Sequence, residues 1–171
     1  MRQSTMTTRR VEIERFTVTT PKPFEVVLAA LKTAVGNPDM AEFVGAIKRA
    51  PTFAEFEDVV RKSVGKTGMM TFMELDHGAI LRRESGLDTP RMVRLVIGNA
   101  LIMKEMAKRV PDAGSYAPVT VLVDKRPDGV HLTYDKTASL LVPYRNADAL
   151  AVARDLDSKV ERLLREAADC Q

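Results

Sequence analysis

The chain has 171 residues, of which 45% are hydrophobic and 29% are charged, and its formal net charge is +3. These proportions are typical of one globular domain with a substantial core. No apolar run reaches the ~20 residues of a membrane-spanning helix. The segment from Met1 to Arg10 lacks the apolar stretch of a secretory signal. We interpret residues 1–10 as a flexible polar tail and residues 11–171 as a single domain.

The composition also argues against two classes of binding partner, nucleic acids and membranes. The basic residues are interspersed with acidic ones and Trp is absent, so neither a basic stripe nor a base-stacking platform is visible. We therefore expect no nucleic-acid partner and no membrane partner. The single cysteine, Cys170, excludes an internal disulfide and a cysteine-based zinc site. We interpret Cys170 as an incidental exposed thiol and predict a cytoplasmic protein.

The first half of the chain predicts a strand followed by helices. Residues 11–20 read as a strand that Pro21 and Pro23 end, and residues 24–35 carry an apolar stripe at helical spacing. Two short helices are predicted between residues 37 and 67, the second with a capping box of Thr52 and Glu55.

The second half mixes strands and helices without a regular βαβ alternation. The pattern predicts strands over residues 69–76 and 91–97, a hairpin over 119–134 with a Pro-Asp-Gly turn, and helices after 79, 99 and 146. The expected class is α+β, a mainly antiparallel sheet with helices packed on one face (β-α-β4-α-like), plus a helical insertion at about residues 37–67.

His77 is the titratable side chain with the strongest functional interpretation. It follows Asp76 at the end of a predicted strand, and a neutral imidazole serves as a general base or as an iron or zinc ligand. A structural, hydrogen-bonded histidine is the alternative. His131 alternates with Val130 and Leu132, which predicts an exposed hairpin residue. Two histidines without an acidic cluster disfavour a mononuclear zinc enzyme.

Three other polar residues lie next to strand ends. Asn99 follows Gly98 and suits a helix cap, and the same helix start could bind an anion or a carbonyl. Tyr116 opens the hairpin. Tyr134 shares a strand face with Val130 and Leu132, which predicts a buried ring with its hydroxyl at a rim.

Two common catalytic motifs are not supported. Gly65-Lys66-Thr67 resembles the end of a phosphate-binding loop, but the first glycine of that motif is replaced by Val60 and a helix precedes it. No Gly-x-Ser-x-Gly elbow is present, so nothing indicates a serine triad.

Four short motifs together resemble a known family. They are Leu75-Asp76-His77-Gly78, Gly98-Asn99, Ala117-Pro118 and Thr133-Tyr134-Asp135. In this order they resemble the larger branch of the domain of unknown function 302 family, although Ala100 stands where that branch has proline. The resemblance excludes roughly residues 36–68 and implies a TATA-binding-protein-like architecture and a homodimer. It implies no reaction.

The leading hypothesis is a homodimeric small-molecule-binding or sensory module, with haem as one candidate cofactor. Its ligand-binding pocket would be lined by His77, Asn99, Tyr116 and Tyr134, with His77 as the axial ligand if haem or another metal is bound. One alternative is an enzyme that uses His77 as a general acid/base, oriented by Asp76 or Asp135. Another is a structural or interaction protein whose helical insertion forms the dimer surface.

Overall fold

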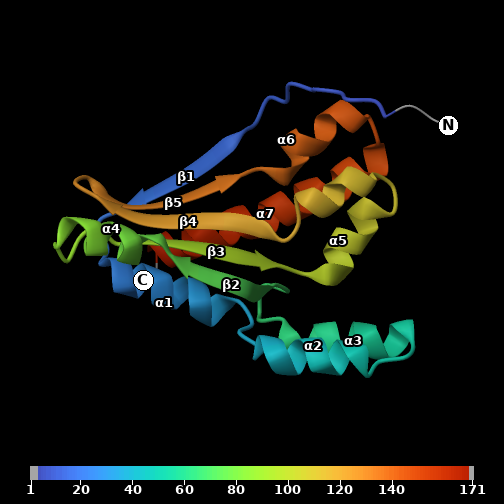
Figure 1. The fold of residues 1–171 in the computed structure, drawn as a ribbon, viewed down its shortest axis with the longest axis horizontal. Coiled ribbons are helices and arrows are strands. Elements are labelled where there is room, and N and C mark those ends of the chain that lie inside the picture. The colour runs from blue at the N-terminus through green and yellow to red at the C-terminus, as the bar shows by residue number, and fades with distance from the viewer. Residues whose placement is uncertain (1–3, 170–171) are drawn as a thin grey trace.

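The computed structural model describes residues 4–169 and contains a five-stranded antiparallel sheet with the strand order β1-β5-β4-β3-β2 (Figure 1). Residues 1–3 of the predicted tail and Cys170 lie outside the described residues. The expected α+β class is confirmed. The strands are β1 (Arg15–Thr20), β2 (Met70–Asp76), β3 (Met92–Gly98), β4 (Val119–Arg126) and β5 (Gly129–Asp135).

Seven α-helices and two 3₁₀ turns are found within residues 4–169. Helix α7 lies behind the sheet in Figure 1, and α1 packs beside α7, so these two helices cover one face of the sheet. The helices are α1 (Phe24–Ala34), α2 (Met40–Lys48), α3 (Phe53–Ser63), α4 (His77–Ser85), α5 (Ala100–Ala107), α6 (Thr137–Leu141) and α7 (Ala147–Asp169), and the turns are η1 (Pro111–Ser115) and η2 (Val142–Tyr144).

The main core lies between the sheet and the α1–α7 layer. Val121 and Leu132 from the sheet are fully buried there, together with Leu31 of α1 and Leu156 of α7. Burying a side chain of this size stabilises a fold by roughly 1.5–3 kcal/mol. Helix α7 is long because its buried residues recur every three or four positions along its whole length.

The opposite face of the sheet carries no helix layer. Along β3 the buried residues Val93, Leu95 and Ile97 point toward the helices, whereas Arg94 is exposed. An antiparallel sheet tolerates this arrangement because its two faces alternate residue by residue. On this open face, β1 from the start of the chain lies beside β5 and β4 from its second half.

The predicted helical insertion is observed as a hairpin of α2 and α3, which extends past the β2 edge of the sheet (Figure 1). Thr52 and Glu55 form the predicted capping box at the start of α3. The base of the hairpin is fixed by the Met69 carbonyl, which accepts hydrogen bonds from the Gly36 and Gly65 amides, both at 2.9 Å.

Two sequence predictions about the strands are wrong. The first strand begins at Arg15 rather than near residue 11, because its partner β5 ends opposite Arg15 at Asp135. His131 is not exposed: the residue is 8% accessible and its Nε2 lies 2.9 Å from an Asp128 carboxylate oxygen in the hairpin turn. The alternation pattern does not reveal this contact with Asp128 across the turn.

Within residues 4–169, no helix combines the length and the apolar character that a membrane span requires.

Candidate functional site

The open face of the sheet is hollowed into a groove of about 570 Å³. His77, Met92 and Arg126 line one end of it, and Tyr116 and Leu140 line the other. These two groups lie at opposite ends of β3 and β4, which places them roughly 20 Å apart at ~3.4 Å per strand residue. The groove is therefore long, and a compact ligand could not contact both ends.

His77 is positioned by the junction between β2 and α4, where it is the first residue of the helix. Its side chain is half-buried and lines the groove. Among residues 4–169 no hydrogen bond or ion pair of its imidazole is found. The ring nitrogens therefore remain available to a molecule bound in the groove.

The neighbouring Asp76 is engaged elsewhere. Its carboxylate accepts a hydrogen bond from the Ala79 amide at 2.9 Å, which caps α4, and another from Arg82 at 2.8 Å. The bond from Arg82 lowers the pKa of Asp76 below its usual value. Asp76 thus stabilises the helix start and does not orient the His77 imidazole.

Asp135, the other acid considered as a partner of His77, is also paired. Arg15 donates two hydrogen bonds to its carboxylate, at 2.7 and 2.9 Å, and this contact lowers the pKa of Asp135. Both residues line the groove. Asp135 lies at the end of β5 that is paired with the start of β1, away from the end formed by His77 and Arg126.

Tyr116 lies at the second end of the groove, just before β4. Its hydroxyl is 3.2 Å from that of Tyr144, which donates a hydrogen bond of 2.7 Å to Asp112. This chain of contacts fixes the orientation of the half-buried Tyr116 ring. Tyr116 can therefore form a rigid wall of the groove.

Asn99 caps α5 and does not line the open groove. Its side chain accepts a hydrogen bond from the Leu101 amide at 2.8 Å and donates one to the Gly68 carbonyl at 2.9 Å. It borders a separate cavity of about 110 Å³ beside Phe72 and Met103. These contacts support the structural interpretation of Gly98-Asn99.

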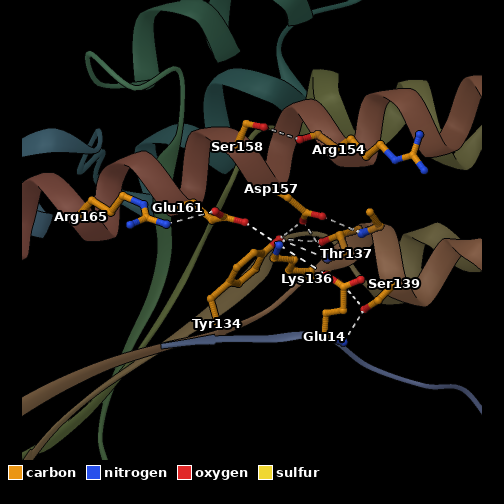
Figure 2. Close-up of polar contacts among 11 residues, drawn as sticks. Glu14, Tyr134, Lys136, Thr137, Ser139, Arg154, Asp157, Ser158, Glu161 and Arg165 are labelled. Carbon is orange, nitrogen blue, oxygen red and sulfur yellow. Dashed lines mark hydrogen bonds and ion pairs between the residues drawn. The ribbon is translucent and has the colours of Figure 1, made fainter. Parts of the chain in front are cut away.

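Tyr134 lies on the helix-covered face of the sheet, opposite the groove, and is 2% exposed. Its hydroxyl donates a hydrogen bond of 2.6 Å to Asp157 of α7 and lies 3.0 Å from the Thr137 hydroxyl (Figure 2). Burial raises the pKa of Tyr134 well above its ordinary value. The ring is buried as predicted, but the hydroxyl does not reach a rim.

Asp157 is a buried polar residue that the sequence analysis missed. Besides the Tyr134 hydroxyl, it accepts hydrogen bonds from the backbone amides of Thr137 at 2.8 Å and Ala138 at 3.0 Å (Figure 2). It therefore caps α6 from within α7. Its place between the buried Leu156 and Val160 was the available signal, because a carboxylate on a buried helix face requires partners.

A second contact holds the same region together at its surface. Lys136, which follows β5, forms ion pairs with Glu161 of α7 at 2.9 Å and with Glu14 at 3.5 Å (Figure 2). Together with the buried Asp157 network, these contacts attach the end of β5 to α7. We interpret both as structural.

The groove offers few donors for a metal. No group of three or more His, Cys, Asp or Glu side chains that could hold an ion occurs within residues 4–169. His77 is the only imidazole among the groove residues. It could supply one axial ligand to haem, and Tyr116 is too far away to supply a second.

The four predicted site residues therefore separate into three places. His77 and Tyr116 share the open groove, Asn99 caps α5 beside a small cavity, and Tyr134 is buried under α7. Arg15, Arg94 and Arg126 also line the groove and were not among the predicted site residues. Alternation along β3 indicates that Arg94 faces away from Val93 and Leu95, but not that this face is open.

The fold and the groove define an α+β protein built on one antiparallel sheet with a helix-covered face and an open face. A family model described as "Domain of unknown function DUF302" matches residues 46–167, which is more than half of the chain, so the protein belongs to this family. The family resemblance stated from the four motifs is confirmed.

The solved structures agree on the fold. An uncharacterized conserved DUF302 protein from Bacillus stearothermophilus has a TM-score of 0.62 and 14% sequence identity, and the match covers 90% of this chain and 97% of the other. At this identity the likeness shows the fold alone. No curated protein matches the chain.

Proposed function

We propose that the protein is a small-molecule-binding or sensory module whose ligand lies in the groove on the open face of the sheet. The observation that carries this proposal is the groove itself, which includes an imidazole, His77, without a polar partner among residues 4–169. In this proposal His77 is a hydrogen-bond partner for the ligand. Tyr116, held by Tyr144, is a wall at the opposite end.

The enzyme alternative has less support. General acid/base catalysis by His77 would benefit from a carboxylate that orients the imidazole. Asp76 and Asp135 are instead bonded to Arg82 and Arg15. Ligand binding needs no such orienting group, so it is the better explanation of the geometry.

The proposal is tested by a thermal-shift screen of a small-molecule library on the wild-type protein. Compounds that raise its melting temperature should lose their effect on His77→Ala or Tyr116→Ala, the variants at the two ends of the groove. Arg83→Ala, an exposed change in the same helix as His77 and outside the groove, should respond like the wild type. If every stabilising compound acts equally on all four proteins, the groove is not the binding site.

Haem is the one cofactor that we propose, with His77 as its axial ligand. An absorbance titration with haemin should give a Soret band for the wild type and for Arg83→Ala, and this band should be lost or displaced in His77→Ala. A titration that leaves the spectrum of free haemin unchanged contradicts haem binding, but it leaves the broader proposal intact.

We also propose that the module is a homodimer that uses the α2–α3 hairpin as its contact surface. In support, the hairpin exposes two large apolar side chains, Val44 (43%) and Phe53 (52%). Exposed apolar residues gathered on one projecting element are typical of protein contact sites. The predicted cytoplasmic location is part of the same proposal.

A further inference from the structure

Arg94 occupies an unusual position in the middle of the open face. Its direct neighbours on the adjacent strands are Leu75 of β2 and Leu122 of β4. Two residues away on β3, on the same face, are Met92 and Val96. All four apolar side chains are partly exposed. A charged group thus lies inside an apolar area of the sheet.

The charge of Arg94 is not neutralised by the protein. Arg15 is paired with Asp135 at 2.7 Å, and Arg126 is paired with Asp124. Among residues 4–169, no carboxylate lies within ion-pair distance of Arg94. Of the three arginines that line the groove, only Arg94 therefore retains an uncompensated positive charge.

The guanidinium of Arg94 also retains most of its hydrogen-bonding capacity. One of its terminal nitrogens donates to the Thr120 hydroxyl at 3.1 Å. A guanidinium has five N–H donors in a planar fork, and the other donors of Arg94, which lines the groove, have no hydrogen-bond partner among residues 4–169. This geometry suits two parallel bonds to a carboxylate, sulfonate or phosphate group.

We infer that the groove binds an amphipathic anion, with its acidic group on Arg94 and its apolar body on Met92 and Leu122. This inference rests on the proposed function and names the ligand class of the same site. Met92 and Leu122 line the groove with Arg94, so one molecule can touch all three. Burial of the apolar body removes water from around the ion pair, which strengthens the attraction between the charges.

Two fluorescent probes that differ in one group test the inference. 1-Anilinonaphthalene-8-sulfonate has an apolar body and a sulfonate, whereas N-phenyl-1-naphthylamine has the same body without a charge. Arg94→Met, which keeps an extended apolar side chain, should bind the sulfonate probe about tenfold or more weakly. Arg94→Lys should have an intermediate affinity, because it keeps the charge without the fork. The uncharged probe should bind the wild type and Arg94→Met equally.

Matched variants distinguish the inference that the ligand is an anion from the broader proposal that the groove binds a ligand. Arg162→Met, an exposed change on α7 outside the groove, should leave both affinities unchanged. Leu122→Trp, which fills the groove, should abolish binding of both probes. If Leu122→Trp blocks binding but Arg94→Met leaves the affinity for the sulfonate probe unchanged, the anion inference is wrong and the groove proposal survives. If Leu122→Trp blocks neither probe, both ideas are overturned.

Discussion

At the scale of single residues, burial and hydrogen bonding have opposite effects on the pKa of Asp157. The residue is 5% exposed, and burial raises the pKa of Asp157 above its ordinary value of 3.8. The three donors from Tyr134, Thr137 and Ala138 favour the ionised form and reduce that shift. The network is fully satisfied, so replacing one carboxylate oxygen with an amide NH2 group would leave at least one buried donor without an acceptor.

Asp157→Asn should therefore lower the free energy of unfolding by about 1–3 kcal/mol at neutral pH. Because the folded state binds the Asp157 proton more tightly than the unfolded state, the stability that this carboxyl contributes grows as the pH falls through its folded pKa. The contribution is complete below the unfolded value of 3.8. The deficit of Asp157→Asn relative to the wild type should thus increase from about pH 7 to about pH 4, as measured by urea unfolding.

Asp155→Asn provides the control for this prediction. Asp155 lies in the same helix, is exposed, and among residues 4–169 forms an ion pair only with Lys159, four residues away. Exposed pairs of this kind contribute about 0.5 kcal/mol or less. A pH-independent deficit in Asp157→Asn, or a deficit that shrinks as the pH falls, would show that burial does not dominate at Asp157.

At the scale of elements, the sequence predicted most strands and helices but grouped the site residues wrongly. His77 directly follows β2 and Asn99 directly follows β3. Because these neighbouring strands are antiparallel, the two residues lie at opposite ends of the strands. Tyr116, just before β4, and Tyr134, near the end of β5, lie at the same end of the strands as Asn99. Only Tyr116 among these three shares a cavity with His77, because Tyr134 faces the helices.

A local irregularity changes the alternation of side chains along β2. A bulge in β2 between Thr71 and Met73 places Thr71 opposite Ile97 and Met73 opposite Val96. Thr71 therefore faces the helix-covered side, whereas Met73 faces the open side. A bulge inserts one unpaired residue and reverses the pattern beyond it. Simple alternation predicts that Thr71 and Met73 share one face, and it cannot locate such an insertion.

The junction that holds the α2–α3 hairpin is sensitive to the size of a single residue. A Cβ atom at Gly65 would lie 2.5 Å from the Gly36 nitrogen and the Val35 carbonyl carbon, which are backbone atoms that cannot move aside cheaply. Gly65→Ala should therefore destabilise the base of the hairpin by about 1–3 kcal/mol. Hydrogen exchange should show faster exchange across residues 37–67 than in the wild type.

Gly45→Ala is the matched control for this junction. Gly45 lies inside α2, and an added Cβ would meet only the side chain of Arg49, at 3.2 Å. Alanine is favoured over glycine in a helix interior by about 1 kcal/mol, so this variant should be neutral or more stable. Equal exchange in Gly65→Ala and in the wild type would mean that the backbone contact between Gly36 and Gly65 does not hold the hairpin.

At the scale of the whole molecule, the pattern of apolar and polar residues predicts the class of fold. It does not predict which face of the sheet is left without helices. The buried residues of β3 and of the first half of β4 alternate as expected for a sheet with one covered face, whereas the first four residues of β5 are all buried. Whether Arg94, Leu122 and Thr133 meet a second layer depends on where α4 to α6 pack, and these short helices carry no signal for that choice. The groove and its uncompensated arginine therefore emerged only from the three-dimensional arrangement.

The proposed homodimer gives the last prediction, because it concerns the molecule as an assembly. A charge placed in an apolar contact must lose its water without gaining a partner, which opposes association. The double variant Val44→Glu, Phe53→Glu should therefore lower the mass measured by sedimentation equilibrium from twice the chain mass of 19.0 kDa to a single chain mass.

The control for the dimer surface carries the same charge change elsewhere. Ile80 and Leu87 are 65% and 64% exposed, in and just after α4 at the other end of β2. Ile80→Glu with Leu87→Glu should keep the wild-type mass, because these residues lie outside the α2–α3 hairpin. If this control separates the chains while the hairpin variant does not, the contact surface lies at α4. A wild-type protein with a single chain mass at all concentrations would contradict the homodimer itself.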